Sequence, residues 1–314
     1  MSLQLDAGGK LRHLLTLEGL PRATLDCLLQ RAQALTDDAQ AACAQRHVLA
    51  GKAVCTLFFE PSTRTRSSFS LAAQRLGADL LNFDASTAST TKGESDIDTL
   101  RTLEAMGVRG FIVRHQQDGA VATLAGAATL GTVLVNAGDG RSNHPTQGLL
   151  DMLTLRQDKG DDFSRMKVLI VGDVKHSRVA RSDLHALRAL GCGEIRVCGP
   201  TALLPGDETL GGCVVGDDLD AMLEGVDALM ILRLQRERMG EGLVASLDDY
   251  HRDYGLTATR LRSAAPDAVV LHPGPMNRGV EITDEVADGP QSRVLRQVAN
   301  GVALRMAVLE ALLG

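Results

Sequence analysis

The sequence predicts an α/β protein built from two doubly wound parallel-sheet domains that are joined by helices. Three observations predict this fold class. Short, continuous apolar runs recur along the chain, as is typical of strands buried on both faces of a sheet. Helical patterns of about 10–15 residues separate most of these runs, which indicates βαβ units. A polar stretch at 157–166 interrupts the series and marks the best domain boundary.

The first half of the chain supplies the elements of the first domain. Its first helix follows Pro21, a residue that suits the first helical position, and carries leucines at helical spacing on one face. Further elements are expected as strands at 53–59, 110–113 and 132–135, and as helices at 65–76, 98–106, 121–130 and 145–156.

The second half supplies a second sheet and a terminal helix. Strands are expected at 167–171, 194–198, 227–232 and 267–271, with a helix at 178–190. The segment 294–313 has the pattern of a long helix, which we expect to pack back on the first domain. The predicted first domain is therefore 1–156 together with the helix at 294–314, and the second is 157–293.

Composition and charge exclude several classes of function. The 314 residues have a net charge of −6 and only 3% aromatic content, which argues against a nucleic-acid-binding surface. No apolar run approaches the roughly 18–20 residues of a membrane helix, and the N-terminus lacks a signal-peptide pattern. The cysteines are scattered without metal-ligand spacing, which predicts buried free thiols. We therefore expect a cytoplasmic protein that binds neither nucleic acid nor membrane, and no metal site.

The most specific local feature is the start of the helix after the first buried strand. Ser62 is a good N-cap residue, and the N–H groups that follow it point toward any anion at the helix start. The helix dipole adds partial positive charge there, and the Thr63 and Thr65 hydroxyls and Arg64 add donors. This pattern predicts a phosphate site. No Walker sequence is present, so a nucleoside triphosphate is not implied.

The run Phe59-Glu60-Pro61-Ser62-Thr63-Arg64-Thr65-Arg66 resembles the carbamoyl-phosphate signature of the aspartate and ornithine carbamoyltransferase family. Further motifs of that family follow in the same order along essentially the whole chain. They are Lys92-Gly93-Glu94, Val113-Arg114-His115, His144-Pro145-Thr146-Gln147, Gly172-Asp173 through Arg178, Arg233-Leu234-Gln235 and His272-Pro273-Gly274-Pro275. Each motif alone is a weak signal, whereas their shared order makes the resemblance strong. It implies a carbamoyl-phosphate-binding domain followed by a domain that binds the amine acceptor.

The resemblance implies which residues hold the reacting end of carbamoyl phosphate. Thr65, Arg114 and His144 surround its carbonyl oxygen, and these are the expected catalytic residues. Donors at that oxygen stabilise the tetrahedral intermediate more than the ground state, which raises the rate. The phosphate is expected at the helix start, on Ser62, Thr63, Arg64 and Thr65.

The carbamoyl NH₂ group is expected to have its own acceptors. Gln147 offers an amide oxygen near the start of the helix at 145–156, and Gly274 and Pro275 offer main-chain carbonyls. The family carries a cis peptide before this proline. Because His144 lies near a helix N-terminus, its ring is expected to be neutral and to donate one hydrogen bond.

The acceptor is expected to be a dicarboxylate, which needs two cationic anchors. The resemblance assigns the α-carboxylate to Arg178 and the side-chain carboxylate to Arg233 with Gln235; arginine binds carboxylates in a bidentate manner. Lys92 lies in a loop that, in the family, reaches the active site of the adjacent subunit. The resemblance therefore implies a homotrimer with shared sites.

Details of the motifs favour aspartate over ornithine as the acceptor. Glu60 stands where the ornithine enzymes usually carry a basic residue, and no cysteine follows His272. The Lys92-Gly93-Glu94 loop is of the aspartate type, and Arg233 would repel the distal ammonium of ornithine. One departure is Ala88, where the family usually has a serine; Ser89 stands beside it.

The expected reaction converts carbamoyl phosphate and L-aspartate to N-carbamoyl-L-aspartate and phosphate, a step of de novo pyrimidine biosynthesis. No metal or organic cofactor is expected, since the leaving group is already activated, and the departing phosphate is the expected proton acceptor. Three alternatives stay open: transfer to another amine such as ornithine, a non-catalytic scaffold subunit, and a plain phosphate-ligand-binding module. The resemblance also leaves open whether regulatory or dihydroorotase-like chains join the trimer.

Overall fold

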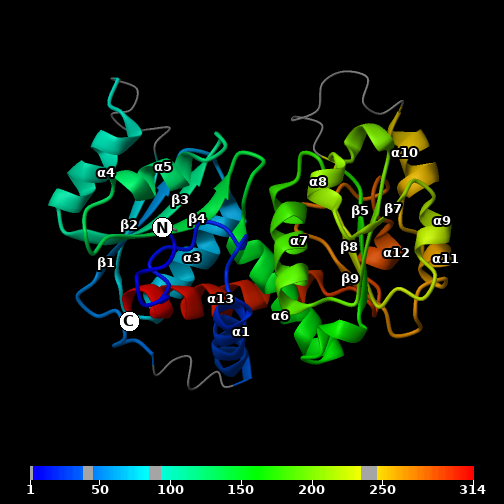
Figure 1. Cartoon of the computed structure of the whole chain (residues 1–314), viewed down its shortest axis with the longest axis horizontal. Helices are drawn as coiled ribbons and strands as arrows, with labels where there is room; N and C mark the ends of the chain where they lie inside the picture. The colour runs from blue at the N-terminus through cyan, green and yellow to red at the C-terminus, as the bar shows by residue number, and fades with distance from the viewer. Residues whose placement is uncertain (1–2, 38–44, 85–92, 235–245) are drawn as a thin grey trace. The chain divides into compact units, whose positions relative to one another are not determined.

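The computed structural model describes residues 3–37, 45–84, 93–234 and 246–314 of the chain (Figure 1). The chain divides into two compact units. Unit 1 comprises Met1–Leu150 and Ala299–Gly314, and unit 2 comprises Asp151–Val298. Each unit contains one all-parallel sheet with helices, so the predicted α/β fold class is confirmed.

Unit 1 is built on a four-stranded parallel sheet with the strand order β2-β1-β3-β4. Its strands are β1 (Ala53–Phe58), β2 (Asp79–Asp84), β3 (Val108–His115) and β4 (Val133–Asp139). Its helices are α1 (Arg22–Asp37), α3 (Thr63–Arg75), α4 (Asp96–Ala105), α5 (Ala120–Ala127), and parts of α6 (Pro145–Lys159) and α13 (Val294–Leu313). Long apolar strands buried on both faces require helices on both faces of the sheet.

Two layers of helices satisfy that requirement in unit 1. Leu103 of α4 and Leu124 of α5 pack with Cys55 and Phe111 on one face of the sheet. On the opposite face α13 approaches β3 so closely that a Cβ at Gly110 would lie 2.7 Å from Leu313. The terminal helix therefore packs back on the first sheet, as the sequence predicts.

Unit 2 is built on a five-stranded parallel sheet with the strand order β7-β6-β5-β8-β9. Its strands are β5 (Lys167–Val171), β6 (Glu194–Cys198), β7 (Val214–Gly216), β8 (Ala228–Ile231) and β9 (Val269–Leu271). Its helices include α7 (Arg178–Leu190), α8 (Asp207–Leu210), α9 (Leu219–Met222), α10 (Leu247–Tyr254), α11 (Ala258–Leu261) and α12 (Asp284–Ala287), with short 3-10 turns at Phe163–Arg165 and Thr201–Leu203.

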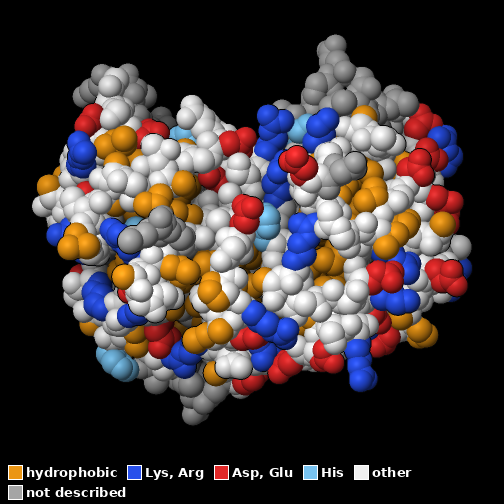
Figure 2. Space-filling view, viewed as in Figure 1, with side chains coloured by type: hydrophobic (Ala, Val, Ile, Leu, Met, Phe, Trp, Pro, Cys, Tyr) orange, Lys and Arg blue, Asp and Glu red, His pale blue; other side chains and the backbone are white. Residues whose placement is uncertain are grey.

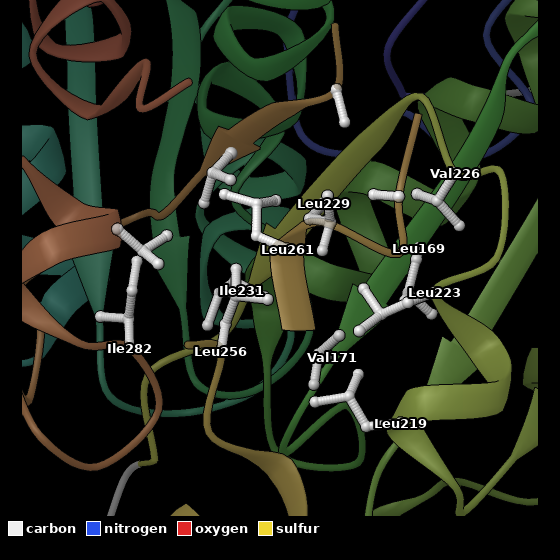
Figure 3. Close-up of a cluster of buried hydrophobic side chains, with 14 of the residues drawn as sticks. Leu169, Val171, Leu219, Leu223, Val226, Leu229, Ile231, Leu256, Leu261 and Ile282 are labelled. Atoms are coloured by element: carbon white, nitrogen blue, oxygen red, sulfur yellow. The ribbon is translucent and has the colours of Figure 1, made fainter. Parts of the chain in front are cut away.

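The core of unit 2 joins its strands to its short helices. Figure 3 shows Leu169 and Ile231 of β5 and β8 in one cluster with Leu219, Leu261 and other apolar side chains from α9, α11 and the loops. Because aliphatic side chains of neighbouring strands and covering helices interdigitate here, the carboxyl ends of β5, β8 and β9 are held in a fixed register.

Most predicted elements occur close to their predicted bounds, and β5, β6, α7 and α13 match them. The edge strands β2 and β7 escaped prediction because their side chains are partly exposed: Leu81 is 40% exposed and Val214 is 50% exposed. Such strands lack the continuous apolar run on which the prediction depended.

One expectation needs adjustment. The five described cysteines are free, but Cys27 is exposed and Cys192 and Cys213 are only half-buried, so burial of the thiols was predicted too broadly.

The surface carries charges of both signs. Figure 2 shows basic and acidic side chains interspersed over the face in view, in keeping with the net charge of −6. Among the helices that the structure describes, none is both long enough and apolar enough to cross a membrane.

Candidate active site

Three predicted residues of unit 1 lie at or after the carboxyl ends of neighbouring strands. Arg114 lies in β3 and pairs in register with Phe58, the last residue of β1. Thr65 lies in α3, which follows β1, and His144 follows β4 directly before α6. Since β1, β3 and β4 are adjacent and parallel, their carboxyl ends share one edge of the sheet, where ligands gather in open α/β sheets.

The start of α3 has no side-chain cap. Ser62 occupies the N-cap position with extended backbone, but its hydroxyl makes no capping hydrogen bond to the first turn. Thr65 is buried, Ser62 is half-buried, and Thr63 and Arg64 are exposed. The sequence thus predicts the position of the cap but not the orientation of its hydroxyl, which leaves the first-turn N–H groups without this internal acceptor.

Arg114 is held by two acceptors of unit 1. Its Nη2 lies 3.1 Å from Oε1 of Glu60, and its Nη1 donates to the carbonyl of Ala137 at 3.2 Å. The Arg114 residue is only 9% exposed, so the nearby carboxylate offsets part of the cost of burying its charge. Glu60 entered the sequence argument only as a mark of the aspartate type, and its contact with Arg114 was not foreseen.

A network around Asp139 shapes the loop that carries His144. The Asp139 carboxylate is 2% exposed and accepts hydrogen bonds from the backbone N–H groups of Asn143 and Gly119, each at 3.1 Å. The His144 carbonyl accepts from the N–H of Gln147 at 2.9 Å, which starts α6. His144 is buried and Gln147 is half-buried. The sequence analysis missed Asp139; a polar residue at the end of an apolar strand was the available signal.

Unit 2 repeats the arrangement of polar residues at adjacent strand ends. Arg178 is the first residue of α7, which follows β5, and Arg233 stands two residues after β8. Gly274 and Pro275 follow β9 and are joined by a cis peptide bond. Arg178 is 5% exposed and Arg233 is half-buried. The adjacent order β5-β8-β9 brings these strand ends to one edge of the second sheet.

The segment that joins β5 to α7 is held by Asp173. Its carboxylate accepts from the His176 N–H at 3.1 Å and contacts the His176 ring at 2.9 Å. Burial raises the pKa of this carboxyl, and the adjacent His176 partly opposes that rise. The Ser177 hydroxyl then caps α7 by accepting from the Ala180 N–H at 3.1 Å. Arg178 is therefore fixed at the first turn of a capped helix.

His272 organises the loop that contains the cis peptide. Its Nδ1 accepts from the Gly274 N–H at 2.8 Å, so the ring proton is on Nε2, which lies 3.2 Å from Oε1 of Glu281. The same Glu281 oxygen accepts from the Asn277 N–H at 2.5 Å. The sequence interpretation treated His272 as a packing and turn residue; the structure adds that it holds the backbone of this loop.

Two predicted residues, Lys92 and Gln235, lie outside the described residues, as does Ala88. Within the part of the chain that the structure describes, no group of three or more histidine, cysteine, aspartate or glutamate side chains has the arrangement of a metal site.

The family model of the aspartate/ornithine carbamoyltransferase carbamoyl-P binding domain matches residues 12–157, and that of the Asp/Orn binding domain matches 164–312. The aspartate carbamoyltransferase catalytic subunit of Stenotrophomonas maltophilia (strain R551-3) is 78% identical over 312 residues, 99% of each chain. This chain belongs to the aspartate/ornithine carbamoyltransferase family.

Solved structures agree with this assignment but do not separate its two branches. Aspartate transcarbamoylase from Trypanosoma cruzi, in complex with carbamoyl phosphate and aspartate, is 30% identical over 100% of both chains with a TM-score of 0.86. Ornithine carbamoyltransferase from Thermus thermophilus is 28% identical, with a TM-score of 0.84, over 96% of this chain and 99% of its own. The fold alone therefore serves either acceptor, and acceptor choice depends on side chains.

Proposed function

We propose that this chain transfers the carbamoyl group of carbamoyl phosphate to the amino group of L-aspartate, which yields N-carbamoyl-L-aspartate and phosphate. The observation that carries the proposal is the uncapped start of α3 on the same sheet edge as the buried Arg114. The relative with 78% identity, named for aspartate rather than ornithine, supports this acceptor.

Carbamoyl phosphate is assigned to unit 1. Its phosphate would accept hydrogen bonds at the start of α3 from backbone N–H groups and from Ser62, Thr63, Arg64 and Thr65. Thr65, Arg114 and His144 would donate to the carbonyl oxygen, which gains negative charge as the amine attacks. One such donor is worth about 3–4 kcal/mol in comparable sites, because its benefit grows on the way to the tetrahedral intermediate.

The Glu60 carboxylate refines the role of Arg114. It engages Nη2, while Ala137 engages Nη1. With two fixed acceptors the guanidinium needs little reorganisation when the oxyanion forms, and preorganised dipoles are the effective ones. Gln147 would accept from the carbamoyl NH₂ group, as would the carbonyls of Gly274 and Pro275.

Aspartate is assigned to unit 2, through Arg178 for the α-carboxylate and Arg233 with Gln235 for the side-chain carboxylate. Arg178 is buried at a capped helix start, which suits a bidentate contact of defined direction. Lys92 would contact phosphate and acceptor. An ornithine side chain would bring its ammonium to the Arg233 guanidinium, and like charges repel.

The wider context follows from the same interpretation. The departing phosphate would accept the amine proton, and the reaction would need no metal or organic cofactor. The enzyme would act in the cytoplasm, in de novo pyrimidine biosynthesis, as a homotrimer in which Lys92 serves the site of the adjacent subunit. Regulatory or dihydroorotase-like chains are candidate partners for a larger assembly.

Product formation from carbamoyl phosphate tests the proposal, with L-aspartate, L-ornithine and L-alanine as parallel acceptors. We expect turnover with aspartate only. Turnover with ornithine alone would contradict the assignment of Arg233. Turnover with alanine equal to that with aspartate would show that the site does not recognise a side-chain carboxylate. Binding of carbamoyl phosphate without turnover of any acceptor would favour the scaffold alternative.

A further inference from the structure

Asn277 lies in the loop after β9 and contacts the segment that follows β8. Its side-chain Nδ2 donates to the carbonyl oxygen of Leu234 at 3.2 Å. Because a carbonyl oxygen can only accept, this contact also determines the orientation of the amide. Residues 232–234 form the Arg233 segment, whose central residue is assigned to the side-chain carboxylate of aspartate. A side chain that is itself assigned to no substrate group therefore joins two segments that carry proposed substrate contacts.

Leu234 is held by apolar packing as well as by this hydrogen bond. It is 1% exposed and packs in a cluster with Leu203 and Tyr250. Val280, from the same loop as Asn277, packs against this cluster. Since Leu234 is shielded from water, its carbonyl oxygen needs an acceptor role within the protein, and a buried carbonyl without a donor costs free energy. The Asn277 amide supplies that donor.

The backbone of Asn277 is in turn held by Glu281. The Asn277 N–H donates to Oε1 of Glu281 at 2.5 Å, and the Asn277 carbonyl accepts from the Val280 N–H at 3.0 Å, which closes a turn. Glu281 is fully buried, and the same Oε1 lies 3.2 Å from Nε2 of His272. Its Oε2 has no hydrogen-bond partner among the residues that the structure describes. Both donors therefore meet at one oxygen.

Two branches of hydrogen bonds lead from this oxygen to the proposed substrate residues. One passes through the His272 ring, whose Nδ1 accepts from the Gly274 N–H at 2.8 Å. The other passes through Asn277 to the Arg233 segment. Gly274 belongs to the backbone proposed to accept from the carbamoyl NH₂ group. The segments assigned to the two substrates are therefore parts of one network, in which second contacts of this kind orient the residues that bind ligand.

We propose that Asn277 is a positioning residue that holds the Arg233 segment in place relative to the Gly274–Pro275 backbone. The effect on aspartate rests on the proposed function, whereas the link between the two segments does not. Asn277 touches no substrate in this assignment, so it is not a catalytic residue. Without the link, the Arg233 guanidinium keeps its charge but is held less firmly in direction, so the loss falls on recognition of the side-chain carboxylate.

Hydrogen–deuterium exchange of the full-length protein, without substrate, tests the link. The Leu232 N–H donates to the Val171 carbonyl at 2.9 Å, so its exchange reports on opening of the Arg233 segment. Asn277→Ala removes the side-chain donor and keeps the backbone N–H that binds Glu281. We expect a peptide spanning 227–234 to exchange about threefold faster or more in this variant than in the wild type. Unchanged exchange would overturn the proposal.

Arg278→Ala is the matched control for this experiment. Arg278 is the next residue of the same loop and is exposed, but its side chain pairs with Asp284 and Asp288 rather than with the Arg233 segment. Exchange of the 227–234 peptide should therefore stay at the wild-type rate. Equal acceleration in Arg278→Ala and Asn277→Ala would show a general loosening of the loop and would also overturn the proposal.

Steady-state kinetics test the positioning of aspartate. Asn277→Ala and Asn277→Asp both remove the amide donor, and the second keeps the size of the side chain. We expect both to raise KM for aspartate roughly tenfold, to change kcat less, and to reduce the preference for aspartate over alanine roughly tenfold.

A merely structural role of Asn277 would lower stability without changing that preference. An unchanged preference in both folded variants would therefore refute the positioning role. If the wild type carbamoylates no acceptor, the proposed function fails, and the exchange experiment still decides whether Asn277 links the two segments.

Discussion

The N-termini of α3 and α7 occupy equivalent places in the two units, but they differ in their capping hydrogen bonds. Each follows a buried parallel strand, β1 or β5, and each has a serine with extended backbone at its N-cap. The Ser177 hydroxyl oxygen accepts from the Ala180 N–H, and Ser177 is 3% exposed. Ser62 makes no such bond. The same residue type thus caps one helix with its side chain and leaves the other without a side-chain cap.

This difference suggests which groups would bind an anion in each unit. In the proposed site, the backbone N–H groups and hydroxyls at the start of α3 would bind the anion, which suits a phosphate with several oxygens. At α7 the serine already caps the backbone, so in the same proposal the carboxylate is assigned to the Arg178 side chain, whose fork matches its two oxygens.

The largest effect is expected at the open start of α3. Thr65→Ala removes a donor to the developing oxyanion, so kcat should fall about 10²–10³-fold, with a smaller change in KM for aspartate. Steady-state kinetics measure this, and Ser67→Ala, an exposed position of the same helix turn, is the control and should be near wild type. A variant that raises KM and spares kcat would contradict the oxyanion role of Thr65.

The acceptor side of the comparison is tested at Arg233. Arg233→Ala should weaken aspartate binding roughly 10–100-fold and reduce discrimination against acceptors that lack the side-chain carboxylate. KM values for aspartate and alanine give the result. Arg262→Ala, at an exposed arginine, serves as the matched control. Unchanged discrimination in Arg233→Ala would assign the second carboxylate to another group.

The buried ionisable groups of the two units should respond to pH in opposite directions. In unit 1, burial and then the charge of Arg12 lower the pKa of His13 to about 4, and its Nδ1 accepts from the Leu134 N–H at 3.0 Å. Between about pH 6.5 and 4, His13 is protonated in the unfolded chain but stays neutral in the folded protein. The free energy of unfolding therefore falls as pH falls. Asp183 in unit 2 has a raised pKa, so its contribution falls as pH rises.

Urea unfolding of the wild type and of His13→Asn across this range measures the unit 1 effect. The asparagine oxygen can accept from the same N–H but does not titrate, so the variant should lose a slope of about 1.4 kcal/mol per pH unit. Parallel pH profiles of the two proteins would show that His13 titrates normally.

The smallest expected effect is a change in stability that distinguishes the two N-cap residues, Ser62 and Ser177. Ser177→Ala should lower the free energy of unfolding by about 1 kcal/mol, because the Ala180 N–H loses its acceptor. Ser62→Ala should leave stability nearly unchanged and instead weaken phosphate binding. Chemical unfolding together with phosphate titration gives both values, and equal losses of stability would remove the distinction between the two helix starts.

Local patterns predicted much of this molecule because their physical causes are local. The apolar run of β5 and the helical pattern of α7 depend on adjacent residues, and both were predicted with the observed bounds. The helix start at Ser62 is equally local. Strand β2 was missed because its pairing with β1, rather than its own apolar content, makes it a strand.

The sequence by itself determined the fold class, the strand-then-helix starts and the types of residue at each strand end. Only the tertiary structure decided which partner each polar group meets. Glu60 contacts Arg114 across 54 residues of sequence, and Gln297 contacts Asp151 across 146. Hydrophobic periodicity describes neighbouring residues and cannot predict contacts over such separations. Whether the Ser62 hydroxyl caps its helix, and in which direction the pKa of Asp183 shifts, depends on burial and on neighbours that the folded chain brings together.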